Sequence, residues 1–315
     1  MAGKKPIVVV GSINTDLVAV TERIPAVGQT VIGSDFQIHP GGKGANQAVA
    51  VARLGYPVRL IGRLGSDPFA TQLRSHLQGA GVDTAGVATS DGTSGVAVIV
   101  VSSRGENSIV VTPGANSKVT PHDLDANIGM IREAGIVLAQ LEIPLETVEY
   151  LASICSRENV PLMLDPAPAR DLPPGIFQYI TWFTPNETEA AFYAQGENGN
   201  EQVSNSAELA RFLLARGCHG VVLKIGEHGV YLASRQGLQV QVPAFPVKAI
   251  DTTAAGDAFN GGFATALMLG KTPLESARFA AIVAAISVTR SGAQPSMPAM
   301  VEVEAFIDRS AARAS

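Results

Sequence analysis

The sequence contains only two cysteines, Cys155 and Cys218, among its 315 residues. They form no CxxC pair and no spacing typical of a metal site, which disfavours a zinc module and predicts two buried free thiols. No segment reaches the roughly 18 uninterrupted apolar residues of a membrane-spanning helix, so we expect a cytoplasmic protein with no membrane partner. The early apolar run from Ile7 to Val10 stops at Gly11. It is too short for a signal peptide and fits a buried first strand.

Two common nucleotide-binding patterns are also missing. No GxxxxGK[ST] loop occurs, and no GxGxxG follows the first apolar run, which excludes a Walker-type phosphate loop and disfavours a dinucleotide-dependent dehydrogenase. The net charge of −5 gives no general attraction to nucleic acid, so no nucleic-acid partner is expected. The five histidines show no metal spacing. Binding of an anionic nucleotide would therefore depend on local features such as helix N-termini.

Apolar residues are abundant, at 46% of the chain, which is enough for a large core. Short runs that are apolar on both faces alternate with segments of helical spacing. This alternation predicts a doubly wound α/β fold, with a mostly parallel sheet and helices on both faces. The expected strands lie at 7–10, 58–61, 136–141, 161–164, 179–184 and 220–224, and the expected helices at 70–80, 145–158, 206–216 and 273–289.

Two regions, 16–37 and 95–111, interrupt this alternation with short runs that are typical of hairpin strands. Strands are expected at 17–20, 30–32, 96–101 and 108–111, and residues 103–107 have the composition of a turn. From the residues alone, these regions predict a pair of ordinary surface hairpins. A polar loop is expected at 196–201.

The motif from Ile250 to Gly262 carries the strongest chemical signal. It places a carboxylate, Asp257, after three residues whose small side chains leave their backbone N–H groups open to an anion: Ala254, Ala255 and Gly256. From Asp257 to Leu269 the spacing is helical, with apolar positions at 259, 263, 267 and 269, so a helix start would face the anion. Phosphoryl transfer needs such donors and a base near the accepting hydroxyl. Helix capping by Asp257 explains the same residues equally well.

A second motif, Pro40 to Ala48, leads into a helix of small residues closed by Gly55. Glycines before a helix permit a ligand to approach the backbone closely. A tight turn before a closely packed helix would also explain the glycines, but it leaves Lys43 and Asn46 without a role. These two side chains make the loop polar enough to hold hydroxyl groups.

Together with 11–16 and 186–189, these two motifs resemble the ribokinase-like carbohydrate kinase family over nearly the whole chain. The resemblance implies a single α/β domain over 1–315, with a β-sheet lid formed from about 14–40 and 95–112. It implies a homodimer made through that lid. It also implies transfer of a phosphoryl group from ATP to a sugar, with Mg²⁺ as cofactor, Asp257 as general base and an anion hole at 254–257.

The resemblance extends to the residues with which ribose-phosphorylating members of the family hold their sugar. It implies D-ribose as substrate, phosphorylated at O5, and the matching positions are Asn14, Asp16, Gly42, Lys43, Asn46, Glu142 and Asp257. A site that hydrogen-bonds each hydroxyl rejects analogues lacking one, because buried polar groups would be left unpaired. The alternatives are a kinase of the same family for 2-deoxyribose, a ketohexose or a nucleoside, and a sugar-binding protein without turnover.

For the nucleotide and the cations the resemblance implies three further groups of residues. The nucleotide would contact Asn186, Lys224, Gly226 and Gly256, and Glu189 would bind Mg²⁺ through water. The position of Ala281, where several relatives carry Asn or His, leaves the preferred base open. From the residues alone, Asn186 reads as a helix cap and Glu189 as a solvated side chain. An activating K⁺ would be held, mostly through backbone carbonyls, at Asp251, Thr253, Ser287, Arg290, Gly292 and Ser296.

Overall fold

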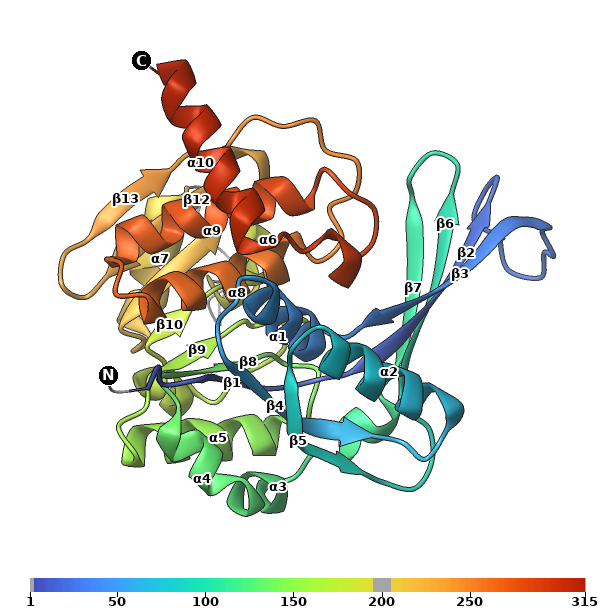
Figure 1. Cartoon of the computed structure of the whole chain (residues 1–315), viewed down its shortest axis with the longest axis horizontal. Coiled ribbons are helices and arrows are strands. Elements are labelled where there is room, and N and C mark those ends of the chain that lie inside the picture. The colour runs from blue at the N-terminus through green and yellow to red at the C-terminus, as the bar shows by residue number, and fades with distance from the viewer. Residues whose placement is uncertain (1–2, 195–204, 315) are drawn as a thin grey trace.

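The computed structural model describes residues 3–194 and 205–314 (Figure 1), so the polar loop expected at 196–201 lies outside the described residues. Nine strands form the main sheet, in the order β13-β12-β11-β10-β9-β8-β1-β4-β5. Neighbouring strands from β11 to β5 pair in parallel, whereas β12 and β13 add an antiparallel edge. The strands are β1 Ile7–Val10, β4 Val58–Leu64, β5 Asp83–Thr89, β8 Ile136–Ala139, β9 Leu162–Leu164, β10 Trp182–Phe183, β11 Gly220–Lys224, β12 Val230–Ser234 and β13 Gln239–Val242.

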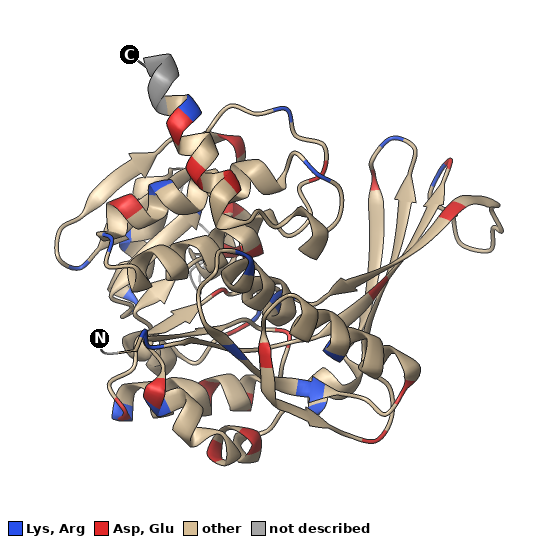
Figure 2. Cartoon of the chain, in the orientation of Figure 1, with Lys and Arg blue, Asp and Glu red and all other residues tan. Residues whose placement is uncertain are grey.

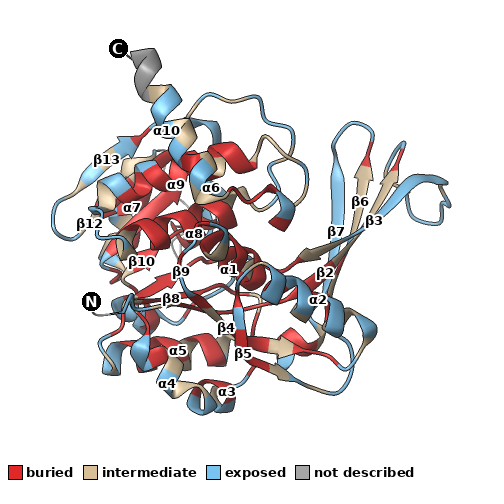
Figure 3. Ribbon diagram, in the orientation of Figure 1, coloured by how far each residue is buried: buried red, intermediate tan, exposed pale blue. Residues whose placement is uncertain are grey.

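Helices cover both faces of this sheet, as predicted, and buried segments lie on both sides of it (Figure 3). Along β1, Ile7 and Val9 belong to one buried cluster and Val8 and Val10 to the other, because successive strand residues point to opposite faces. The first cluster includes α1 Lys43–Arg53, α2 Pro68–Gly79, α8 Ala255–Met268, α9 Pro273–Ser287 and α10 Met300–Ala314. The second includes α3 Pro121–Ala126, α4 Ile128–Glu133, α5 Leu145–Arg157, α6 Glu187–Ala194 and α7 Ser206–Ala215. The doubly wound α/β class is therefore confirmed.

Some expected boundaries are wrong. The strand predicted at 179–184 shrinks to β10, because Pro174–Tyr179 winds into a 3-10 turn with prolines at its start. Other 3-10 turns lie at Gly114–Lys118, Gly226–His228 and Gln294–Ser296. The strands β5, β12 and β13 were not predicted from the sequence. These strands have short or partly exposed patterns.

A second sheet of four strands projects from the main body, in the order β3-β2-β6-β7 (Figure 1). Its strands are β2 Asn14–Thr21, β3 Gly33–Gly41, β6 Gly95–Ser102 and β7 Asn107–Thr112. Here the strand expected at 30–32 is wrong: β3 begins at Gly33, which pairs with the last residue of β2, and Ile32 is 88% exposed. Residues 30–32 lie past the end of β2 and have no strand to pair with.

Both cysteines are buried free thiols, as expected. Burial raises the pKa of each, to about 12. In the part of the chain that the structure describes, no helix combines the length and apolar character needed to cross a membrane.

Candidate active site

The glycine-rich motif ends β3 and starts α1. Gly42 is the N-cap of α1 with φ of 88°, and a side chain there would lie 2.7 Å from the backbone nitrogen of Asn14. Glycine adopts this positive φ without strain and, having no side chain, leaves room for the neighbouring backbone. The helix begins at Lys43, earlier than the sequence suggested, so that Asn46 and Gln47 lie in its first turns and are buried.

The late motif forms the N-terminus of α8. The N-cap Ala254 has left-handed backbone angles, φ 59° and ψ 16°, which cost a non-glycine residue about 1–2 kcal/mol. Such strain is typical of functional sites. The helix begins at Ala255, two residues before its predicted start, and places Asp257 in the first turn. The N–H of Ala255 donates to the carbonyl of Thr252 at 3.2 Å. Leu269, predicted as an apolar position of the helix, lies after its end and is 41% exposed.

The two motifs meet at the carboxylate of Asp257. Asn46 donates its side-chain amide to Oδ2 of Asp257 at 3.0 Å, and Gln47 donates to Oδ1 at 3.0 Å. Gln47 also donates to Asp165 at 3.0 Å. Helices α1 and α8 pack against each other, and this packing brings the groups together. Sequence reasoning missed Gln47 and Asp165, although Gln47 directly follows the predicted Asn46.

Burial sets the protonation of this centre. It raises the pKa of Asp257 to about 6; the charge of Lys43 opposes that rise, while the charge of Asp165 adds to it. Burial by itself lowers the pKa of Lys43, but the surrounding carboxylates, led by Asp257 and Asp165, outweigh it and raise that pKa above its ordinary value. Lys43 is therefore a cation at neutral pH, and Asp257 is a buried carboxylate whose pKa of about 6 leaves it mostly ionised there.

The predicted sugar residues surround this centre. Glu142 accepts from the hydroxyl of Ser12 at 2.5 Å and from the N–H of Lys43 at 3.2 Å. Asn14 accepts from the side-chain amide of Asn116 at 2.7 Å. Burial raises the pKa of Asp16 to about 6, and the charges of Glu142 and Asp257 contribute to the rise.

Three of the four residues predicted for the nucleotide lie next to one another. Lys224 ends β11, and its backbone bridges to Asn186. Its Nζ is 3.1 Å from Oδ1 of Asp165, and a side chain on Gly256 would lie 3.4 Å from that Nζ. The ammonium group of Lys224 is therefore beside the first turn of α8. Gly226 follows in a 3-10 turn with φ of 55°.

Asn186 and Glu189 bond to each other. Glu189 accepts from the backbone N–H of Asn186 at 2.8 Å and from its side-chain amide at 3.0 Å, while the N–H of Glu189 donates to Oδ1 of Asn186 at 2.8 Å. This reciprocal pattern caps α6, the role that the residues alone suggested for Asn186. Burial raises the pKa of Glu189, and the charge of Asp165 adds to the rise. Glu189 is buried, contrary to the solvated side chain inferred from the residues alone.

The residues predicted for a monovalent cation lie in two segments that Asp251 ties together, one before α8 and one from the end of α9 to the 3-10 turn at Gln294–Ser296. One carboxylate oxygen of Asp251 accepts from the N–H of Thr253 and the other from the N–H of Gly292, each at 2.8 Å. Arg290 is paired with Glu302. The hydroxyls of Ser287 and Ser296 donate to backbone carbonyls at 2.9 and 2.7 Å. Among the described residues, no three His, Cys, Asp or Glu side chains gather as a metal-binding cluster.

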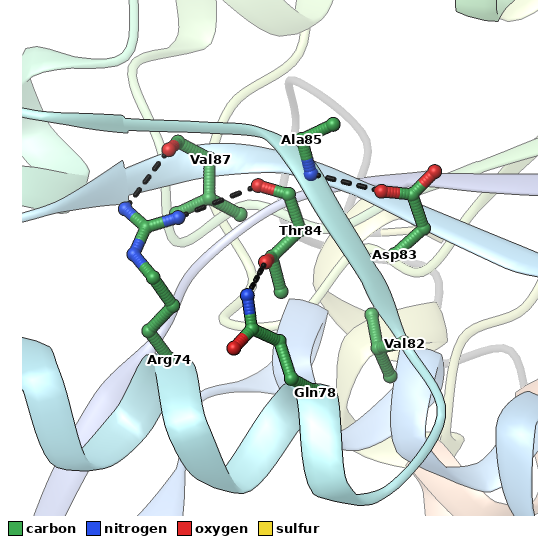
Figure 4. A pocket seen from close by; sticks show the side chains of 7 residues that line it. All are labelled: Arg74, Gln78, Val82, Asp83, Thr84, Ala85 and Val87. Carbon is green, nitrogen blue, oxygen red and sulfur yellow. Dashed lines mark hydrogen bonds between the residues drawn. The ribbon is translucent and has the colours of Figure 1, made fainter.

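The hollow drawn in Figure 4 lies elsewhere, between α2 and β5. Arg74 donates to the carbonyl of Val87 at 3.0 Å and Gln78 to the hydroxyl of Thr84 at 3.0 Å, so its polar side chains are engaged with the protein. None of its lining residues belongs to the network around Asp257. This hollow is therefore separate from the polar network around Asp257.

The chain is similar to known proteins over nearly its whole length. The family model of the pfkB family carbohydrate kinases matches residues 4–300. The chain is 40% identical to the ribokinase of Haemophilus influenzae, over 97% of this chain and 99% of that protein. It is 35% identical to a deoxyribokinase of Salmonella typhi, over 96% and 98% of the two chains. The structure of the Arabidopsis thaliana ribokinase complexed with ribose and ATP matches with a TM-score of 0.89 and 33% identity, over 96% and 98% of the two chains.

The chain belongs to the pfkB family of carbohydrate kinases. This membership confirms the resemblance drawn from its motifs and the predicted class of enzyme, a sugar kinase.

Proposed function

We propose that the protein transfers the γ-phosphoryl group of ATP to O5 of D-ribose and releases ribose 5-phosphate and ADP. One observation carries the proposal: a buried carboxylate, Asp257, lies in the first turn of α8 and is held by Asn46 and Gln47 of the glycine-rich motif. The likeness to ribokinases in sequence and fold supports ribose as the acceptor.

The reaction begins when Asp257 accepts the proton of the ribose 5-hydroxyl as O5 attacks the γ-phosphorus. The bond from that phosphorus to the oxygen bridging to the β-phosphate breaks, and ADP leaves with its electron pair. Backbone N–H groups at 254–257 would stabilise the charge on the phosphoryl oxygens. The N–H of Ala255 already donates to the carbonyl of Thr252, which makes it the weakest of these candidate donors.

The sugar would be held by Asn14, Asp16, Gly42, Lys43, Asn46 and Glu142. The ionised groups among them suit a ring of hydroxyls, because each can accept from or donate to one hydroxyl. The kinship to a deoxyribokinase makes 2-deoxyribose the second candidate substrate. Loss of one hydroxyl would leave a polar group of this site unpaired, which favours ribose.

The nucleotide would lie along Asn186, Lys224, Gly226 and Gly256. Mg²⁺ usually keeps several waters and binds substrate phosphates with one or two carboxylates, which agrees with the lack of a protein-only metal cluster among the described residues. Each Glu189 oxygen accepts one protein hydrogen bond and has a lone pair left for such a water. When bound, Mg²⁺ would offset the charge on the phosphates.

A potassium ion would brace the loops joined by Asp251, at Thr253, Ser287, Arg290, Gly292 and Ser296. Asp251 supports this placement because its two oxygens already hold the loop before α8 and the loop at Gly292. A cation bound there would stiffen the approach to the anion hole.

We further propose that the chain is one domain, that its small sheet closes over the sugar as a lid, and that two lids pair in a homodimer. Opposed residues in a sheet share a face. Asp16 therefore faces one side, together with Ile109 and Val111, and the other side carries a larger set of apolar residues: Leu17, Phe36, Ile38, Val98, Val100 and Val110. Phe36, Ile38, Val98 and Val110 are exposed, and the strands carry few charges (Figure 2). An apolar patch of this kind is typical of a contact surface.

The proposal is tested by ADP release with Mg²⁺ and ATP or GTP, over D-ribose, 2-deoxyribose, fructose and adenosine. We expect ribose to give the highest kcat/KM. A preference for another acceptor would support the kinase activity but refute ribose as the substrate. Binding of ribose without ADP release would instead indicate a sugar-binding protein. The comparison of ATP with GTP decides which nucleobase is preferred, a question left open by the buried Ala281.

A further inference from the structure

Two chains of side-chain amides converge on Asp257 from opposite sides. On one side, Gln140 donates to the carbonyl of Gln47 at 2.7 Å, and Gln47 donates to Asp257 at 3.0 Å. On the other, Gln294 donates to the carbonyl of Asn46 at 3.1 Å, and Asn46 donates to Asp257 at 3.0 Å. In both chains the hydrogen bonds run in one direction, from the outer glutamine to the inner amide and from there to the base.

Chemistry allows only this direction. An ionised carboxylate accepts hydrogen bonds and cannot donate them, so the NH₂ group of Gln47 must face Asp257. The carbonyl of Gln47 is then left to face a donor, and Gln140 supplies it. Within the described part of the chain, the far oxygens of Gln140 and Gln294 are buried without a hydrogen-bond partner. A buried acceptor without a hydrogen bond destabilises the fold through its desolvation. Here such acceptors lie only at the outer ends of the two chains, away from Asp257.

Gln47 differs from Asn46 because it holds two carboxylates at once. One N–H of its amide reaches Oδ1 of Asp257 and the other reaches Oδ2 of Asp165, each at 3.0 Å. Asp165 in turn holds Lys224 at 3.1 Å, beside the first turn of α8. A single amide therefore joins the proton-accepting carboxylate to the carboxylate that holds a cation on the nucleotide side. The side chain of Gln47 is fully buried, so it does not act through the solvent.

We propose that Gln47 is a positioning residue for the phosphoryl transfer: oriented by Gln140, its amide fixes Asp257 as an ionised proton acceptor and aligns it with the Asp165 and Lys224 pair. This inference rests on the proposed function, in which Asp257 is the base. In this role Gln47 needs no contact with either substrate.

Removal of this amide has a predictable electrostatic effect. The charged groups that act on Asp257 include Lys43 from α1, which favours its ionised form, and Asp165 after β9, which opposes it. The amides of Asn46 and Gln47 both favour the ionised form. Asp16 and Glu142, on the sugar side, add negative charge nearby. Without the Gln47 donor, Asp257 would hold its proton to higher pH, and it would also lose alignment with Asp165.

The test is the pH profile of kcat/KM for ribose in Gln47→Met, which keeps the length of the side chain and removes its donors. Loss of one hydrogen bond to a charged group should move the acid limb to higher pH by about one unit. Gln47→Glu should move it further, because a third carboxylate is added between Asp165 and Asp257. Gln78→Met on α2, which removes a glutamine bond to Thr84 remote from the site, is the matched control and should leave the limb in place.

An acid limb for Gln47→Met that coincides with the wild-type limb, even at a lower overall rate, would overturn the inference, because a merely structural residue moves no pKa. Should Gln47→Met fail to fold, Gln140→Met decides, since it leaves the Gln47 donors in place and removes their orienter. We expect a smaller shift in the same direction, and no shift would overturn the inference. Wild-type protein that is inactive on ribose, or Asp257→Asn that stays active, would refute the proposed function instead.

Discussion

Asn46 and Asp257 lie 211 positions apart in the chain, yet the amide of Asn46 donates to the carboxylate of Asp257 at 3.0 Å. The contact joins the first turns of α1 and α8. It places the base of the proposed reaction against the glycine-rich motif that would hold the sugar. The contact between one side chain of each motif therefore gives the two motifs a joint role in the proposed reaction.

Replacement of Asp257 by Asn should lower kcat about 10²–10⁴-fold, the usual contribution of a general base. Ribose binding should remain measurable, because the neighbouring polar groups stay in place. Single-turnover kinetics and calorimetric titration with ribose measure the two effects separately. Turnover close to the wild-type value would refute the assignment of the base.

Asp16 offers a prediction on stability as well as on binding. Its folded pKa of about 6 exceeds the ordinary value of 3.8, first because of burial. The folded protein therefore binds this proton more tightly than the unfolded chain, and the stability it contributes is present at low pH and lost as pH rises through about 6. Asp16→Asn should then melt at a higher temperature than the wild type at pH 8, with the difference closing by pH 4.

The same substitution should raise KM for ribose about 10–100-fold, since a charged hydrogen bond to the sugar is lost. Thermal melts at the two pH values and steady-state kinetics check both parts. A melting difference that does not depend on pH would contradict the electrostatic explanation.

Gly261 should be intolerant of a side chain. Its position in α8 faces α1, where an added Cβ would lie 2.6 Å from the Cβ of Ala50 and 3.1 Å from the carbonyl of Gln47. Gly261→Ala should destabilise the protein by about 1–3 kcal/mol through overpacking. Gly129→Ala in α4 is the control, since nothing lies within 4 Å of its added Cβ, and it should be neutral or stabilising. Denaturant titration compares them, and equal stability of the two variants would contradict this packing.

Potassium should raise kcat, whereas a bulky organic cation should not. Asp251→Ala should remove this difference, because the carboxylate that joins the two loops is lost. The exposed Asp308→Ala on α10 should respond to potassium as the wild type does. Rates measured in each salt at one ionic strength provide the comparison. Activity of the wild type that is equal in both salts would count against a cation site.

The exposed apolar face of the small sheet should carry the dimer contact. Ile38→Asp would place a charge in that face and should yield a monomer, while Val301→Asp, on the exposed side of α10, should not change the assembly. Light scattering at micromolar concentration gives the mass of each. A wild-type protein that is monomeric there would refute the dimer.

Much of the site was accessible from the sequence because its key groups are local. Asp257 follows three small residues, and Lys43 follows two glycines, so each motif shows its chemistry within a few positions. The capping of α6 by Asn186 was also readable, since Asn186 accepts from an N–H three residues along the chain. The burial of Glu189 was not. Gln47 was not recognised, because its partners Asp257 and Asp165 lie 210 and 118 positions away.

The sequence by itself determined the α/β class, because runs apolar on both faces can be buried only between two layers of helices. It also indicated a helix after each of the two small-residue motifs, although α1 and α8 both begin earlier than predicted. The tertiary structure decided where strands end and which side chains meet. Residues 30–32 are β-prone but lie past the end of β2, and Asp165 becomes part of the site only because β9 ends beside the N-terminus of α8. Such outcomes depend on partners distant in the chain, which no local pattern encodes.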